Sequence, residues 1–205
     1  MSDQDYLNER RKALKESVEF FAPTRKIERE KWIVAETLTN LGVLFSDMEL
    51  QPVSDEPPDI RFRGAEFELK EIMDPGRPRH LEYKKALQRA SDITDPAELL
   101  EPFRPRDTTH TEIYEKVLTT TSELLSKYVP STGHNLDLLF YVNLQDVMGL
   151  IETPFPNVAA LCLQPWRSVS FLLGHRTCVL VARNDAPAFI RDAVGKVVHR
   201  QIASA

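Results

Sequence analysis

The sequence predicts an α/β fold in which a central sheet is covered by helices. Apolar residues recur at helical spacing from Thr24 to Leu41, and Gly42 ends that run. Two short segments, 59–63 and 65–70, alternate apolar and polar residues in the manner of strands. A second helical segment and a dense apolar run, 136–144, follow. Helical and strand patterns in this order favour one α/β domain.

The elements before the middle of the chain have clear boundaries. Thr24 is placed to cap the first helix, whose core face carries Ile27, Val34, Leu38 and Leu41. A first strand is expected within 43–53. Thr109 and Glu112 form a capping box that opens the second helix, with four residues toward the core: Ile113, Val117, Leu124 and Leu125.

The C-terminal part predicts three strands and a helix. The apolar run 136–144 is one strand, and 168–182 reads as two strands turning at Gly174 and His175. Asn184 and Pro187 indicate the start of a last helix. Its apolar residues are Phe189, Ile190, Val194, Val197 and Val198.

The two segments around Gly64 predict a hairpin with a defined register. If Arg63 and Gly64 are the loop residues, three pairs follow: Phe62 with Ala65, Arg61 with Glu66, and Ile60 with Phe67. Asp59 then lies opposite Glu68, and both carboxylates share one face of the sheet.

Two carboxylates placed opposite each other on neighbouring strands repel, so a positive group is expected between them. One candidate is Lys70, which lies on the same face. The other is a divalent cation held by Asp59, Glu68 and the Leu69 carbonyl. Such oxygen ligands suit Mg²⁺ or Mn²⁺. The structural alternative is a salt-bridged sheet surface in which Lys70 pairs with Glu68 and Arg61 pairs with Glu66.

Pro58-Asp59, a short spacer and Glu68-Leu69-Lys70 resemble the PD-(D/E)xK signature of the restriction-endonuclease-like nucleases. Within that superfamily the chain is identified as a member of a small group of bacterial proteins described as candidate endonucleases. The resemblance implies a core of helix, three strands, helix and strand (αβββαβ), with a mixed central sheet. It implies that Asp59 and Glu68 are metal ligands and that Lys70 orients the attacking water.

The same resemblance implies a further metal-proximal glutamate on the first core helix. Glu30 shares a face with Val34 and Leu38 and is the preferred candidate. Glu36, on the flank of the helix, is the alternative.

The charge distribution is compatible with a nucleic-acid partner, DNA favoured over RNA. The net charge of −5 opposes phosphate binding, but residues 32–60 are acidic without any Lys or Arg, and basic residues gather elsewhere. The residues expected to contact nucleic acid are Arg61, Arg77, Arg79, Lys84 and Lys85.

The domain organisation has two additions to the core. Residues 1–22 form an amphipathic helical arm, expected to dock on the body or to form a homodimer; the nuclease-like domain spans 23–205. An insertion, 74–107, follows the Glu68 strand directly and is placed to cover a substrate groove, or is an ordinary loop.

No apolar stretch reaches the roughly 20 residues of a membrane span, and the N-terminus lacks signal-peptide features, so a cytoplasmic location is expected. Cys162 and Cys178 are expected to be buried, reduced thiols.

These observations together predict a metal-dependent nuclease that hydrolyses phosphodiester bonds. The alternative is an inactive protein of the same fold that acts as a nucleic-acid-binding or oligomeric interaction module, because fold alone does not establish activity.

Overall fold

The computed structural model describes residues 2–55, 57–99 and 104–200. Within it the long helices are α1 (Asp3–Phe20), α2 (Lys26–Asn40), α3 (Arg79–Asp92) and α4 (His110–Leu124). Single helical turns are α5 (Pro130–Gly133), α6 (Ala159–Cys162) and α7 (Ala188–Arg191). The strands are β1 (Gln51–Pro52), β2 (Ile60–Phe62), β3 (Ala65–Met73), β4 (Arg106–Thr109), β5 (Asp137–Asn143), β6 (Val147–Ile151), β7 (Ser168–Leu173), β8 (Arg176–Ala182) and β9 (Val197–His199).

The contacts divide the chain into two compact units. One unit joins Met1–Arg29 to Pro75–Arg104, and the other joins Glu30–Asp74 to Pro105–Ala205. The domain limits expected from the sequence stay a prediction, and each unit is described by itself.

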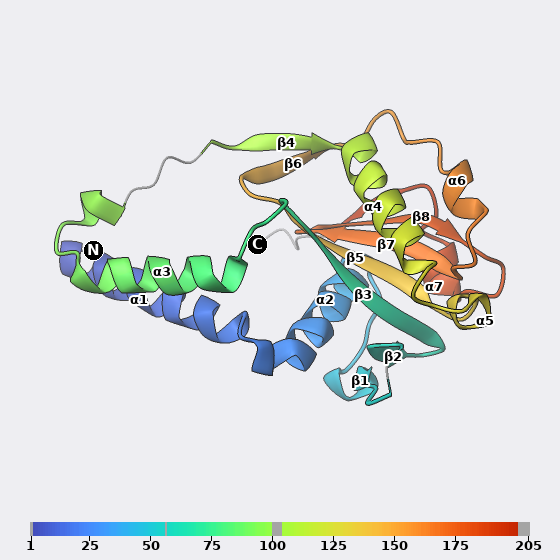
Figure 1. The fold of residues 1–205 in the computed structure, drawn as a ribbon, viewed down its shortest axis with the longest axis horizontal. Coiled ribbons are helices and arrows are strands. Elements are labelled where there is room, and N and C mark those ends of the chain that lie inside the picture. The colour runs from blue at the N-terminus through green and yellow to red at the C-terminus, as the bar shows by residue number, and fades with distance from the viewer. Residues whose placement is uncertain (1, 56, 100–103, 201–205) are drawn as a thin grey trace. The chain divides into compact units, whose positions relative to one another are not determined.

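The first unit is built by α1 and α3, which lie side by side (Figure 1). The apolar stripe of α1 is buried in this packing, with Leu7 and Leu14 only 1% and 5% exposed. Arg11 donates hydrogen bonds to the carbonyls of Ala90 and Ile93, at 2.8 and 2.7 Å. These carbonyls lie at the C-terminal end of α3, where helical partners are lacking, so the guanidinium caps that helix.

The second unit contains a mixed sheet with the strand order β1-β2-β3-β5-β7-β8-β9. The neighbours β3, β5 and β7 run parallel, while the other pairs are antiparallel. Along the chain the core order is α2, three strands, α4 and β5, as Figure 1 shows. The prediction of an α/β fold with a mixed central sheet and an extra N-terminal helix is therefore confirmed.

Helices cover both faces of this sheet. On one face α2 contributes Val34 and Leu38 to a core with Phe67 of β3. On the other face α4 contributes Ile113 and Val117 to a core with Phe140 of β5. The capping box at Thr109 and Glu112, which the sequence predicted, opens α4. The two cores fix which side chains of β3 face which helix.

The last helix was predicted too long. Helix α7 ends at Arg191, and Gly195 then takes a positive φ of 72° that a continuing helix does not permit. Val197 and Val198 lie in β9, which pairs with β8. The valines are β-branched and fit the open edge of the sheet, so strand pairing replaced the helix. The sequence also gave no indication of the two-stranded parallel sheet of β4 and β6.

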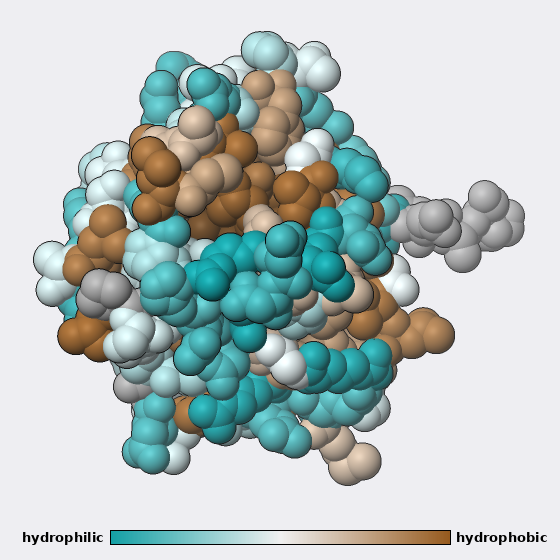
Figure 2. All heavy atoms as spheres, turned by 90° about the vertical axis from the view of Figure 1, so that its right-hand side faces the viewer, coloured by the Kyte–Doolittle hydropathy of each residue, from teal (hydrophilic) through white to brown (hydrophobic). Residues whose placement is uncertain are grey.

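Three side chains expected in the interior are exposed. Ile27 is 55% exposed near the start of α2, which begins at Lys26 after a 3₁₀ turn, Pro23–Arg25. Leu125 is 42% exposed just past the end of α4, and Cys162 on α6 is exposed as well. Figure 2 views the side on which α5 and α6 lie and shows apolar side chains gathered in a patch bordered by hydrophilic ones.

None of the helices in the described ranges is both long and apolar enough to cross a membrane.

Candidate active site

Three of the four pairs that the sequence predicted for the hairpin of β2 and β3 form, and the fourth, Asp59 with Glu68, lies outside the paired ladder because β2 begins at Ile60. Ile60 pairs with Phe67, Arg61 with Glu66, and Phe62 with Ala65. The loop residues Arg63 and Gly64 both have positive φ, 40° and 81°, as a tight two-residue turn requires. The alternation of side chains along both strands is therefore fixed.

This alternation places Glu68 and Lys70 on one face of β3. Phe67 and Leu69 point into the core covered by α2, whereas Ile72 belongs to the core covered by α4. Because successive side chains of a strand alternate, Glu68 and Lys70 share the α4 side with Ile72.

Asp59 is tied to β3 by its backbone and by its side chain. Its N–H donates to the Phe67 carbonyl at 2.9 Å, and its Oδ2 accepts the Leu69 N–H at 2.8 Å. The Asp59 residue is only 5% exposed. Since the N–H and C=O of a strand residue point to the same edge, the Leu69 carbonyl also faces Asp59.

Glu68 is 3% exposed and has two different oxygens. Its Oε1 accepts a hydrogen bond of 2.6 Å from the Tyr128 hydroxyl and one from Lys70 Nζ. Its Oε2 is buried and accepts no hydrogen bond within the described part of the chain. A buried carboxylate oxygen without a donor is costly, so it calls for a water or a cation.

The site offers only a few protein ligands to a hard divalent cation. Over the ranges that the structure describes, no three His, Cys, Asp or Glu side chains lie together in a way that could hold a metal. Two carboxylates, from Asp59 and Glu68, and the Leu69 carbonyl remain. Mg²⁺ is commonly bound by one or two carboxylates while it keeps several waters, and the uncompensated Oε2 of Glu68 supplies a ligand.

The structure does not bring Glu30 into a three-acid group with Asp59 and Glu68. Glu30 is buried on α2, which packs on the face of the sheet opposite to Glu68. Glu36 forms an ion pair with Arg200. Neither glutamate is assigned a metal-binding role by this geometry.

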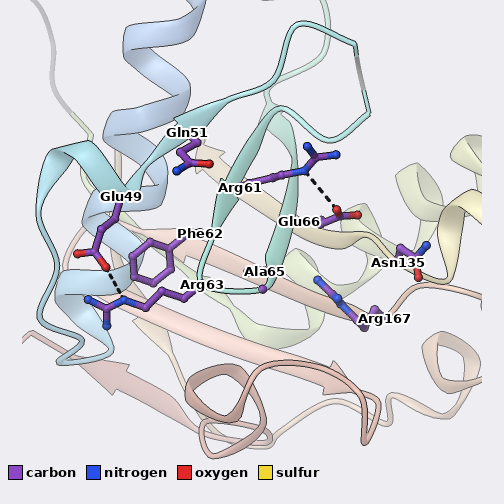
Figure 3. Close-up of a pocket in the computed structure, with 10 residues that line it drawn as sticks. Glu49, Gln51, Arg61, Phe62, Arg63, Ala65, Glu66, Asn135 and Arg167 are labelled. Atoms are coloured by element: carbon purple, nitrogen blue, oxygen red, sulfur yellow. Dashed lines mark hydrogen bonds and ion pairs between the residues drawn. The ribbon is translucent and has the colours of Figure 1, made fainter.

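The basic residues expected to contact nucleic acid lie in both units. Arg61 is in the second unit, where its Nε is 3.3 Å from Glu66 Oε1 (Figure 3). In the first unit Arg77 pairs with Glu82 at 2.9 Å, and the Arg79 guanidinium stacks on the Phe21 ring at 3.8 Å from its centroid. Lys84 and Lys85 are exposed on α3.

The site contains a residue that sequence reasoning missed. Tyr128 lies in the turn after α4, outside any helical or strand pattern, and its hydroxyl reaches Glu68 only because α4 covers that face of the sheet. The sole signal in the sequence was an aromatic residue between the helix end and Pro130.

Comparison with known proteins places the chain in a family. The model of the family described as "Putative endonuclease, protein of unknown function (DUF1780)" matches residues 2–204. No curated protein matches the chain. A solved structure of a Pseudomonas aeruginosa PAO1 protein, described as of unknown function and of the monooxygenase superfamily, is similar with 25% identity and a TM-score of 0.68. The match covers 99% of this chain and 98% of that one.

Proposed function

This chain belongs to the DUF1780 family, and on that premise we propose that it is a divalent-metal-dependent nuclease that hydrolyses phosphodiester bonds. The observation that carries the proposal is the state of Glu68. This buried carboxylate is fixed by Tyr128 and Lys70 through one oxygen, while its other oxygen lacks a partner in the described chain. That oxygen lies on the sheet face predicted to hold the metal.

Each residue then has a separate role in the reaction. Asp59 and Glu68 would ligate Mg²⁺ or Mn²⁺ together with the Leu69 carbonyl. The cation, when bound, supplies positive charge that stabilises the negative charge that builds on the phosphate. Lys70 is 26% exposed and has three ammonium protons, of which Glu68 uses one. The remaining protons are available to hold and orient the attacking water.

The residues of this site favour hydrolysis, which differs from the chemistry that the superfamily name of the similar solved structure suggests. That protein is described as a member of the monooxygenase superfamily. Carboxylates beside a lysine bind a hard cation and position a water, but they do not exchange electrons themselves. We therefore base the proposal on the family description and on the chemistry of Asp59, Glu68 and Lys70.

Cleavage of labelled substrates tests the proposal. Wild-type protein with Mg²⁺ or Mn²⁺ is expected to cut single-stranded DNA, duplex DNA or RNA, with DNA the preferred class. Lys70→Ala should lower the rate by about 10²- to 10⁴-fold, the usual contribution of a positioned proton-handling group. Lys127→Ala removes an exposed lysine beside Tyr128 and is the matched control. Equal rates for the two variants would contradict the assigned role of Lys70.

The burial of both acids favours one alternative, a nuclease-fold protein that binds nucleic acid without cutting it. Asp59 and Glu68 are 5% and 3% exposed, which restricts access of a phosphate to them. Binding that persists in EDTA, without cleavage of any substrate in the panel, would support this module and reject the enzyme.

We also propose that the exposed lysines of α3 contact the nucleic-acid backbone. Lys84→Gln with Lys85→Gln should weaken binding equally for all sequences and reduce its salt dependence. Unchanged binding by the double variant would exclude that contact.

A further inference from the structure

A polar cavity of about 530 Å³ lies at the turn end of the hairpin in the second unit. Figure 3 shows side chains around it that come from the segment before β2, from the hairpin, and from Asn135 and Arg167 further along the chain. Three arginines line the cavity together with two glutamates and an asparagine: Arg61, Arg63, Arg167, Glu49, Glu66 and Asn135. Because guanidinium groups bind phosphate through paired N–H donors, a cavity lined by three arginines is a candidate site for phosphate.

Arg167 is held rigidly at this cavity. Its Nε lies 3.1 Å from one oxygen of Asp137, and its Nη2 binds the other. Asp137 is only 1% exposed and also accepts hydrogen bonds from Ser168 Oγ and the Glu66 N–H, at 2.7 and 2.9 Å. The remaining nitrogen of Arg167, Nη1, makes no hydrogen bond to the described residues. This fixed guanidinium is therefore a preorganised donor.

The other two arginines are held more loosely. Arg61 Nε is 3.3 Å from Glu66, and both side chains are partly exposed. Arg63 donates to Glu49 at 2.6 Å and to the Leu44 carbonyl at 2.9 Å. Exposed ion pairs of this kind contribute little net stability, so a phosphate can displace them. The hydrogen bond from the Arg63 guanidinium also lowers the pKa of Glu49.

The cavity adjoins the candidate active site along one face of the sheet. Glu66 lies two residues before Glu68 on β3, and Arg61 pairs with Glu66 across the hairpin. A strand rises about 3.3 Å per residue, so the two positions are roughly 7 Å apart along the strand. That spacing is comparable to the step between successive phosphates of an extended nucleic-acid strand.

We propose that this cavity binds a phosphate of the nucleic-acid strand next to the phosphate held at Asp59 and Glu68, an inference that rests on the proposed function. Arg167 provides the fixed donor. Arg61 and Arg63 exchange their carboxylate partners for phosphate oxygens, and Asn135 lines the same cavity. The subsite contacts the phosphate backbone and does not distinguish between bases.

Fluorescence anisotropy of a labelled single-stranded DNA oligonucleotide tests the subsite. The measurement is made in EDTA, so that binding is observed without metal-dependent cleavage. The double variant Arg61→Gln, Arg63→Gln should bind about ten-fold more weakly at low salt. The slope of log K against log salt should fall by about 0.7, because about 0.7 is lost for each phosphate contact to a single strand and the cavity holds one phosphate. Arg191→Gln removes an exposed arginine outside the cavity and should bind nearly as the wild type does.

Arg167 needs a variant that preserves the fold. Arg167→Gln alone leaves the buried Asp137 without its cation, which is strongly destabilising. The double variant Asp137→Asn, Arg167→Gln removes both charges together, and a circular-dichroism melt establishes its folding before binding is measured. It should weaken binding by about ten-fold as well. If the Arg61, Arg63 double variant binds DNA with wild-type affinity and salt slope, the subsite is rejected. This holds whatever affinity the Asp137, Arg167 double variant shows.

Cleavage assays distinguish a failure of this subsite from a failure of the proposed nuclease activity. If the arginine variants lose binding but the wild type cuts no substrate, the subsite stands and the nuclease proposal fails. If Lys70→Ala abolishes cutting while the arginine variants bind and cut normally, the nuclease stands and the subsite fails.

Discussion

Tyr128 donates a 2.6 Å hydrogen bond to Glu68, a residue 60 positions earlier in the chain. The bond joins the turn after α4 to the middle of β3. It is charge-assisted, because Glu68 also binds the ammonium group of Lys70 through the same oxygen. Tyr128 thereby fixes the orientation of the carboxylate and leaves its second oxygen for another ligand.

Tyr128→Phe removes only this hydroxyl. We expect the free energy of unfolding to fall by about 1.5 kcal/mol, as for a hydrogen bond to a charged group. We also expect Mn²⁺ affinity, measured by calorimetry, to fall by about 10- to 100-fold, because the bond orients a metal ligand. Tyr114→Phe is the control: Tyr114 packs against the same core, and its hydroxyl makes no hydrogen bond to the described residues. An unchanged Mn²⁺ affinity in Tyr128→Phe would limit Tyr128 to a structural role.

Glu112 makes the stability of the fold at the start of α4 sensitive to acid. Hydrogen bonds from the Thr108 hydroxyl and then from the Thr109 N–H lower the pKa of this carboxyl. A carboxyl whose pKa is lower in the folded state stabilises the fold above its unfolded pKa, about 4.5, and that contribution is lost as pH falls through the folded value. In urea unfolding at pH 7 and pH 3, Glu112→Gln should therefore lose less stability on acidification than the wild type.

The exposed acid Glu115 provides the control for that experiment. It lies one turn further along α4, and its carboxylate makes no hydrogen bond or ion pair with the described residues. Glu115→Gln should respond to acid as the wild type does. The same acid response in the Glu112 and Glu115 variants would contradict the account.

The two cysteines should differ sharply in reactivity. Burial raises the pKa of the Cys178 thiol to about 12, whereas Cys162 is exposed on α6. The thiolate is the reactive form, so iodoacetamide at pH 8 should alkylate Cys162 in the native protein and reach Cys178 only in denaturant. Mass spectrometry of the adducts checks this order. Rapid native labelling of Cys178 would show that the α4-side core opens readily.

The elements with strong local signals were predictable from the sequence. Gly64 and the alternation around it defined the hairpin register, and Thr109 with Glu112 defined the start of α4. These features depend on a few neighbouring residues. Local backbone preferences and side-chain alternation therefore suffice to find them.

The features that were missed depend on contacts between distant segments. Val197 and Val198 form β9 because β8 offers an open edge, and Tyr128 enters the site because α4 lies on the sheet. The Asp137 and Arg167 pair likewise forms between residues 30 positions apart. No local sequence pattern encodes contacts between distant segments. For this reason a helix was predicted at Val197 and Val198, where a strand forms.

The central claim is that Asp59 and Glu68 bind a divalent cation, and thermal melts of wild type and Asp59→Asn with and without Mg²⁺ test it most directly. Asparagine keeps an oxygen for the Leu69 N–H but removes one of the two negative charges proposed to bind the cation. We predict that Mg²⁺ raises the wild-type Tm, because a ligand of the folded state adds about 2.7 kcal/mol at 100 times its Kd. Without Mg²⁺, Asp59→Asn should melt at or above the wild-type Tm and should not respond to Mg²⁺. A destabilised Asp59→Asn, together with a wild-type Tm indifferent to Mg²⁺ and Mn²⁺, would contradict the metal site.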